Sequence, residues 1–539
     1  MRYRSISAIL PAIVTLLSFA NTSAGQVRCV EPQELQAAIS RLSSATPASK
    51  NEKLGSEAIK LSKDLAADIQ KARIDQPKSE KAQRQLAETE AEAIRMICGQ
   101  IAAAGWPKRE ELGDEGALSF LYLLTKAIPV RQQLELYPLV SEAYARGEIR
   151  GGEILAAYVD RLRLALGRRQ LYGSQVTIND GFLVMAPIER AGEVDKRRSA
   201  FGMQPLRSYE RFLELTYRMP LIRGVMEPTQ RTAEALQEKK QQPSVNGLFD
   251  AGEEEAIKVQ TAYVSLDVVI RASTDAGPVE LEKGDFRLFD NGKPVEIESF
   301  AKADTPFDIV LLLDLSGSTA DKVGLIKKTT RRFIEMKRPD DRVAVVTFHN
   351  DQTVVSELEA DKKVLLERVK KIEGRGGSYI WDAVKFGIDL LEKGPPSNRR
   401  KAIVLMSDGG DNLLTYYPTQ NKRMGFADLI EAIQLSTVSI FPIFLDTSGD
   451  FPASERFYRD SRRTLAYMAE QSAGTLYAAR KLEDVAGVYD RVLKDVGTIY
   501  TIGFTPDIES GDRQWRTVKV EVPSRPDLKL RHRPGYFTN

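Results

Sequence analysis

Short apolar runs alternate with helical patterns between residues 305 and 496, and this alternation constrains the fold more than any other feature of the chain. The runs hold few polar residues, so each expected strand must be buried on both faces. A helix between successive strands lets all of them point the same way. The pattern therefore predicts an α/β domain with a doubly wound, mostly parallel sheet. The expected strands are Ile309–Leu313, Val343–Phe348, Ala402–Met406 and Val438–Leu445, with a short antiparallel edge strand at Val354–Leu358.

Alternating strands of a different kind flank this domain on both sides. Before it, Asn291-Gly292 joins two alternating segments, which is a strong hairpin signal because both residues tolerate positive φ. Similar segments follow the domain, and neither group of two or three strands would be a stable sandwich alone. We therefore expect residues 257–302 and 497–539 to form one small, split β-sandwich, with the α/β domain, at 305–496, inserted into it.

The chain begins with a predicted targeting segment. Arg2 and Arg4 precede an apolar stretch, and Thr22-Ser23-Ala24 supplies small residues that a signal peptidase recognises. The apolar stretch falls short of the about 18–20 residues that a membrane anchor needs. We expect residues 1–24 to be a signal peptide that is cleaved near Ala24, and the mature protein to be exported, either periplasmic or secreted.

A helical domain and a linker are predicted to follow. Apolar residues spaced three and four apart indicate an all-α domain over residues 27–223, and polar composition indicates a linker over 224–256. In an exported protein, Cys29 and Cys98, the only two cysteines, are expected to form a disulfide bond. Two buried free thiols are the alternative.

Charge and histidine content exclude several classes of function. Lys and Arg number 77 against 75 for Asp and Glu, so no strong field attracts nucleic acid. No later stretch is apolar enough to span a bilayer, so no permanent membrane span is expected. The two histidines, His349 and His532, are far apart and lie in no motif, which argues against a zinc protease site.

Hydroxyl and carboxyl side chains follow two of the expected strands and precede one of the expected helices. Asp314, Ser316 and Ser318 come after the first strand, Ser378 precedes a helix, and Asp408 follows the strand at 402–406. The carboxyl ends of parallel strands meet at one edge of a sheet, where ligands bind. Oxygen ligands with few carboxylates suit one divalent cation, Mg²⁺ or Mn²⁺. The alternative is structural: Ser318 caps the next helix and Asp408 sits in a turn.

These motifs resemble a known site. Asp-Leu-Ser-Gly-Ser at 314–318, Gly-Gly-Ser at 376–378 and Leu-Met-Ser-Asp-Gly-Gly-Asp at 405–411 are similar to the metal-ion-dependent adhesion site of von Willebrand factor A domains. The resemblance covers about 305–496, and Ser378 stands where Thr is usual, which keeps the hydroxyl and loses a methyl group. It implies a non-enzymatic adhesion module in which a protein partner's Asp or Glu completes the metal shell.

A second resemblance covers about residues 100–215. Its motifs are similar to a bacterial helical domain family of unknown function, so it implies no activity. Lys126 stands where His is usual and Ser174 where Thr is usual. Asp160, Arg161 and Gln175 are interpreted as polar residues that tie helices together. The motifs are Gly105-Trp106-Pro107, Asp160-Arg161, Gln170 to Gln175 and Val194 to Arg198.

Two rival functions remain at this point. The first is a metal-dependent hydrolase, for which His349 is the only candidate base close to the expected site. The second is a scaffold whose metal stabilises the fold while the helical domain binds a partner. Neither the identity of the partner nor the oligomeric state follows from the sequence.

Overall fold

The computed structural model describes most of the chain, except residues 1–28, 225–262 and several shorter segments. The expected signal peptide, and all but the first residue of the expected linker, therefore lie outside the described residues. The described residues are 29–43, 52–76, 78–150, 152–224, 263–272, 280–301, 305–316, 323–372, 378–393, 399–407, 409, 423–445, 455–479, 487, 491, 492, 495, 499–507 and 515–537.

The chain divides into two compact units. The first comprises Met1–Tyr209 with Arg223–Glu254, and the second comprises Glu210–Ile222 with Glu255–Asn539. Residues 210–222, which the sequence assigns to the helical domain, therefore group with the second unit.

Helices dominate the N-terminal region up to α8, as the periodicity predicts; α1 to α7 belong to the first unit, whereas most of α8 lies in the segment 210–222 of the second unit. Two of them, α2 and α4, cross closely at Gly55 and Gly116, where a Cβ on Gly55 would lie 2.7 Å from the carbonyl oxygen of Leu112. The core between the helices is apolar and includes Ile97, Leu123 and other fully buried side chains. The helices are α1 (Pro32–Ser43), α2 (Glu52–Gln70), α3 (Glu80–Ala104), α4 (Arg109–Ala127), α5 (Val130–Ala145), α6 (Glu153–Ala165), α7 (Val194–Ala200) and α8 (Leu206–Tyr217).

A small three-stranded sheet accompanies these helices, and the helical periodicity of the sequence does not predict it. Strands β1 (Val176–Asn179), β2 (Phe182–Met185) and β3 (Leu221–Arg223) lie in that order. Asp180 and Gly181 join β1 to β2 with φ of 46° and 82°, as a tight hairpin turn of two residues requires. The strands hold three or four residues each, too few for a clear alternating pattern.

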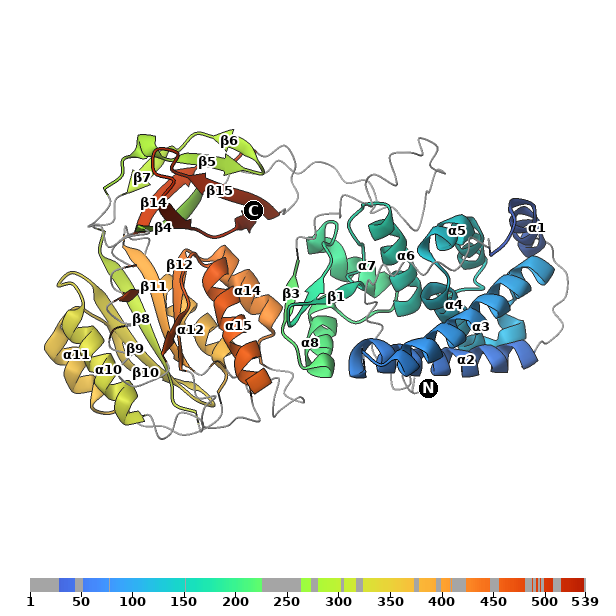
Figure 1. Ribbon diagram of the computed structural model, residues 1–539, viewed down its shortest axis with the longest axis horizontal. Helices are drawn as coiled ribbons and strands as arrows, with labels where there is room; N and C mark the ends of the chain where they lie inside the picture. The colour runs from blue at the N-terminus through green and yellow to red at the C-terminus, as the bar shows by residue number, and fades with distance from the viewer. Residues whose placement is uncertain are drawn as a thin grey trace. The chain divides into compact units, whose positions relative to one another are not determined.

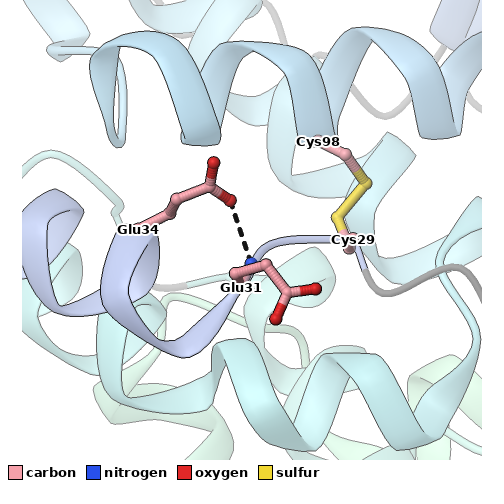
Figure 2. The surroundings of a disulfide bond; sticks show 4 residues. All are labelled: Cys29, Glu31, Glu34 and Cys98. Atoms are coloured by element: carbon pink, nitrogen blue, oxygen red, sulfur yellow. Dashed lines mark hydrogen bonds between the residues drawn. A yellow bond between two sulfur atoms is a disulfide. The ribbon is translucent and has the colours of Figure 1, made fainter.

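The two cysteines form a disulfide bond, as expected. Cys29, just before α1, is bonded to Cys98 on α3, across a sequence separation of 69 residues and a Cα–Cα distance of 5.0 Å (Figure 2). Beside it, the backbone amide of Glu31 donates to the carboxylate of Glu34 at 3.0 Å, which ties the residues before α1 to its first turn. The disulfide bond thus fixes the start of α1 to α3.

The second unit contains the predicted parallel sheet, with strand order β10-β9-β8-β11-β12-β13. All neighbouring strands in it are parallel except β9 and β10, so the predicted antiparallel edge strand is confirmed. Every residue of β8 and of β12 is buried, as apolar strands between two helical layers require. The strands are β8 (Phe307–Asp314), β9 (Arg342–Phe348), β10 (Gln352–Glu359), β11 (Arg400–Ser407), β12 (Val438–Leu445) and β13 (Tyr477–Ala479).

Helices cover both faces of this sheet (Figure 1). On one face lie α10 and α11, and on the other lie α12, α14 and α15. The chain runs from β8 outward to β9 on one side and later to β11 on the other, so the strand order reverses between β8 and β11. Such a switch point opens a crevice at the carboxyl ends of the strands. The helices are α10 (Val323–Met336), α11 (Lys362–Val369), α12 (Ile380–Glu392), α14 (Phe426–Leu435) and α15 (Glu455–Gln471).

Two antiparallel sheets are built from strands that come before and after the α/β region in the sequence. Their strand orders are β16-β4-β14-β7 and β17-β15-β5-β6. The α/β region is thus inserted between strands that pair with one another, as expected. Asn291 and Gly292 have φ of 47° and 77° and join β5 to β6, as the hairpin signal predicts. The strands are β4 (Val264–Ala272), β5 (Arg287–Asp290), β6 (Lys293–Val295), β7 (Ser299–Ala301), β14 (Ile499–Phe504), β15 (Trp515–Glu521), β16 (Leu528–Arg531) and β17 (Gly535–Phe537).

The disulfide bond should contribute measurably to the stability of the first unit. Replacing both Cys29 and Cys98 by Ser should lower its free energy of unfolding by about 4 kcal/mol, because the bond closes a long loop in the unfolded chain. Urea unfolding followed by helical circular dichroism measures the change. Mass spectrometry of the protein from its native compartment should find no alkylatable thiol, and finding two would contradict the bond.

The split sandwich predicts that the C-terminal strands are needed for folding. Both strands that pair with β4 in its sheet, β14 and β16, come from the end of the chain. A chain that ends at residue 496 would leave both edges of β4 unpaired and its apolar face uncovered, so it should aggregate. Size-exclusion chromatography tests this. A monomeric truncated chain with an unchanged melting temperature would show that the pairing is dispensable.

Candidate metal centre

Asp314 is the last residue of β8, and its carboxylate is fully buried at the carboxyl edge of the parallel sheet. The backbone amide of Ser316 donates to Oδ1 at 2.9 Å. The hydroxyls of Ser378 and Ser407 donate to Oδ2 at 2.9 Å and 2.6 Å. A buried carboxylate is costly unless it is hydrogen-bonded, and these donors from three segments satisfy it.

The serine hydroxyls around Asp314 are suited to hold a cation. Ser316, Ser378 and Ser407 are all buried, with at most 3% of each residue exposed. A hydroxyl has one hydrogen and two lone pairs. Because Ser378 uses its hydrogen on Asp314, its lone pairs point elsewhere, where a cation could take them. Asp314 would supply negative charge close to such a cation.

Three of the five predicted ligands lie in the described residues, and the structure brings Asp314, Ser316 and Ser378 together. The other two, Ser318 and Asp408, lie outside the described residues. The chain positions on either side of Asp408 are described: Ser407 contacts Asp314, and its hydroxyl accepts from the amide of Gly409 at 2.9 Å.

Ser407 is a residue of this site that the predicted ligand set omits. A signal for it exists in the sequence, since Ser407 directly precedes Asp408 at the end of a predicted strand. In the parallel register, Met406 is opposite Leu313, which places Ser407 beside Asp314. Its hydroxyl donates to Asp314 and accepts from Gly409, so its role is to hold the carboxylate and the turn after β11.

His349, the candidate base of the hydrolase alternative, lies in the turn between β9 and β10. Its Nδ1 accepts from the backbone amide of Asn350 at 2.7 Å, and its own amide donates to the carbonyl of Asp351 at 3.2 Å. Nδ1 is therefore engaged with the backbone of its own turn. This arrangement is that of a structural turn residue, and it gives the hydrolase alternative no support.

The residues at the site fit a hard cation held mainly by hydroxyls. Within the described ranges, no group of three or more His, Cys, Asp and Glu side chains is placed to hold a metal ion. A site with two or three serine oxygens and one carboxylate does not form such a group. Its oxygen-only chemistry excludes the nitrogen and sulfur ligands that zinc prefers, and suits Mg²⁺ or Mn²⁺.

The sequence of this region identifies the domain. Residues 309–410 match the family model of the von Willebrand factor type A (VWA) domain. The second unit contains a VWA domain. The match runs from β8 to just beyond β11, so it includes Asp314, Ser378 and Ser407, the residues that meet at the edge of the sheet.

The helical region matches another family. Residues 55–221 match a family of unknown function, DUF6624, whose match begins earlier than the resemblance seen in the sequence. Within it, the buried Asp160 accepts from the backbone amides of Leu171 and Ser174 and from the Ser174 hydroxyl. Gln175 donates to the carbonyl of Ala157 at 3.0 Å. Asp160 and Gln175 thus join α6 to the loop after it, whereas the interpretation from the sequence is that these polar residues tie helices to one another.

Three solved structures match this chain at low identity. A von Willebrand factor type A protein from Catenulispora acidiphila is 15% identical with a TM-score of 0.30, over 53% of this chain and 74% of that one. BatB from Bacteroides thetaiotaomicron is 13% identical with a TM-score of 0.27, over 36% and 100%. The VWF domain of the type V pili tip protein Mfa5 from Porphyromonas gingivalis is 13% identical with a TM-score of 0.29, over 36% and 95%.

No curated protein sequence matches the chain. In the part of the chain that the structure describes, none of the helices has the length and apolar character needed to cross a membrane.

A buried carboxyl group lies at the start of α14, near this edge of the sheet. Glu214, in the segment 210–222 of the second unit, accepts from the amide of Phe426 at 2.9 Å and from that of Leu221 at 3.0 Å. Arg211 forms an ion pair with it at 3.1 Å. Burial nevertheless raises the pKa of Glu214 to about 7, against the opposing effect of these hydrogen bonds and of Arg211. Glu214 thus caps the first turn of α14.

This raised pKa predicts a pH-dependent stability of the second unit. Between about pH 4.5 and pH 7 the folded chain keeps the Glu214 proton, whereas the unfolded chain has released it. The contribution of this proton to the free energy of unfolding is therefore full below about pH 4.5 and is lost as pH rises through about 7. In the Glu214→Gln variant the side-chain amide does not titrate in this range, and its oxygen can still accept from the same backbone amides. The melting temperature of the wild type minus that of Glu214→Gln should therefore fall between pH 5 and pH 8.

Calorimetry of both proteins across this range measures the difference. Glu392→Gln, at an exposed position of α12, is the matched control for replacing a carboxyl by an amide. A difference between wild type and Glu214→Gln that stays constant or grows with pH would contradict a raised pKa.

Proposed function

We propose that the VWA domain binds one divalent cation, Mg²⁺ or Mn²⁺, through Asp314, Ser316, Ser318, Ser378 and Asp408, and that the cation holds a partner protein. A bound cation would supply an open coordination position for a carboxylate of the partner. The protein is then an adhesion-type binding module and not an enzyme. The family match and the arrangement of the described residues support this function.

One observation supports it most directly. The Asp314 carboxylate is buried at the switch point of the sheet, and its Oδ2 accepts from hydroxyls of two other segments, Ser378 and Ser407. Burying a carboxylate costs desolvation free energy, which an apolar residue at the end of β8 would not cost. A function in cation binding gives a reason for this cost, because the negative charge of Asp314 would attract the cation and its hydrogen bond with Ser378 orients that hydroxyl.

The partner we propose presents an Asp or Glu side chain on its surface. Few carboxylates surround the expected cation, so its charge is not fully neutralised by this chain, and an anionic ligand is favoured over a neutral one. The disulfide bond supports a location outside the reducing cytoplasm. We therefore propose that the protein is exported and that its partner is found in the same compartment.

Substitutions at Asp314 test the cation directly. Mg²⁺ should raise the melting temperature of the wild type, because a ligand at 100 times its Kd stabilises the folded state by about 2.7 kcal/mol. Asp314→Ala should remove this response, and Asp314→Asn, which keeps the shape without the charge, should remove most of it. Asp389→Ala, on the exposed side of α12, is the control and should respond as the wild type does.

Capture of the partner should depend on the same cation site. In a pull-down from the exported fraction, Asp314→Ala should lose Mg²⁺-dependent capture, Ser378→Ala should weaken it, and Asp408→Ala should lie between them. Changing the partner's contacting Asp or Glu to the amide should also abolish capture. Full capture by Asp314→Ala in the presence of a chelator would end the proposal.

A further inference from the structure

Arg423 joins three segments at the carboxyl edge of the parallel sheet. Its Nη2 donates to the carbonyl of Asn350, in the turn after β9, at 2.8 Å. Its guanidinium carbon lies 4.1 Å from the centroid of the Tyr379 ring, at the start of α12. Arg423 itself belongs to the segment that leads into α14. A planar guanidinium can lie flat over a ring while it donates hydrogen bonds in its own plane, a geometry that a tetrahedral ammonium group lacks.

Two acidic residues complete the surroundings of this side chain. Arg423 forms longer ion pairs with Asp382 on α12, at 3.7 Å, and with Asp351, at 3.6 Å. The Asp382 carboxylate also accepts from the amide of Met424 at 3.3 Å. Glu214 accepts from the amide of Phe426, so carboxylates on two sides hold the backbone that carries Arg423. About a quarter of the Arg423 side chain is exposed, at 23%.

The stacked ring belongs to the residue beside a proposed ligand. Tyr379 is buried, and it directly follows Ser378, whose hydroxyl donates to Asp314. A shift of Tyr379 must therefore move Ser378 relative to the carboxylate. The Arg423 guanidinium limits such a shift, because it covers the Tyr379 ring and donates to the turn after β9. That turn is held in place by β9, which pairs with β8, the strand that carries Asp314.

From these contacts we infer that Arg423 is a positioning residue of the cation site: it fixes the start of α12 against the turn after β9, so that the Ser378 hydroxyl stays on Asp314. The inference rests on the proposed function, since it concerns the same cation. Groups that orient metal ligands typically affect metal affinity by about 10- to 100-fold when they are removed.

The charge of Arg423 alone predicts the opposite effect. A positive charge near a cation site repels the cation, so removing that charge would tighten Mg²⁺ binding if charge were all that mattered. Positioning predicts weaker binding when the stacking and the hydrogen bond are lost. The sign of the change therefore distinguishes the two roles, and Arg423→Lys separates them further because it keeps the charge and loses the planar group.

The test is isothermal titration of Mg²⁺ into the full-length chain. Arg423→Met and Arg423→Lys should each weaken Mg²⁺ binding by about 10-fold relative to the wild type. Tyr379→Phe keeps the ring and should retain the wild-type affinity, whereas Tyr379→Leu should bind like the Arg423 variants. Arg459→Met, at an exposed position of α15, is the matched control and should leave the affinity unchanged.

Hydrogen exchange without metal provides a second measurement. In Arg423→Met the amides at the start of α12, such as Ala383, should exchange faster than in the wild type, while those of β8 should not change. Wild-type affinity in both Arg423 variants, tighter binding in Arg423→Met, or unchanged exchange at α12 would each overturn the positioning role and leave the proposed function standing. A wild type that does not bind Mg²⁺ would overturn the proposed function and this inference together.

Discussion

The buried carboxylate of Asp314 determines how the edge of the parallel sheet is arranged. An ionised group in this position is stable only if donors reach it, and the chain supplies them from the residues after β8, the start of α12 and the end of β11. Removing one such donor leaves part of a buried carboxylate unsatisfied, which costs about 1–3 kcal/mol. The three segments are thereby held in one geometry before any cation arrives. A site arranged in advance in this way needs little rearrangement to bind a small, hard cation.

A second polar cluster joins the parallel sheet to the antiparallel strands at the opposite edge. Asp267 on β4 accepts from the Thr501 hydroxyl on β14 at 2.8 Å, and burial raises its pKa. Arg400, the first residue of β11, donates to the Thr501 hydroxyl at 3.1 Å, and Ser439 on β12 donates to Asp267 at 3.5 Å. These contacts involve the amino ends of β11 and β12. The sandwich strands therefore meet the parallel strands at their amino ends, whereas Asp314 and its donors lie at the carboxyl ends.

The sequence predicts those parts of the fold that depend on local pattern. The apolar runs specify the buried parallel strands, and Asn291-Gly292 specifies its hairpin because both residues tolerate the positive φ that a two-residue turn requires. The small sheet of β1, β2 and β3 cannot be predicted in this way, because strands of three or four residues are too short to show an alternating pattern. Within the site, Asp314, Ser316 and Ser378 follow from motif and strand position. Arg423 and Glu214 do not, because their contacts join residues 73 and 212 positions apart, and no local pattern encodes which residues meet at that distance.

The central claim, that this edge of the VWA domain holds a divalent cation, is tested most directly by diffraction from crystals of the full-length protein soaked in Mn²⁺. Anomalous scattering locates manganese without any assumption about its ligands. The account predicts one strong anomalous peak within bonding distance of the Ser378 hydroxyl oxygen and close to Asp314, and no such peak in crystals of Asp314→Ala. A wild-type crystal without a peak at this edge, or with its strongest peak elsewhere on the protein, would contradict it.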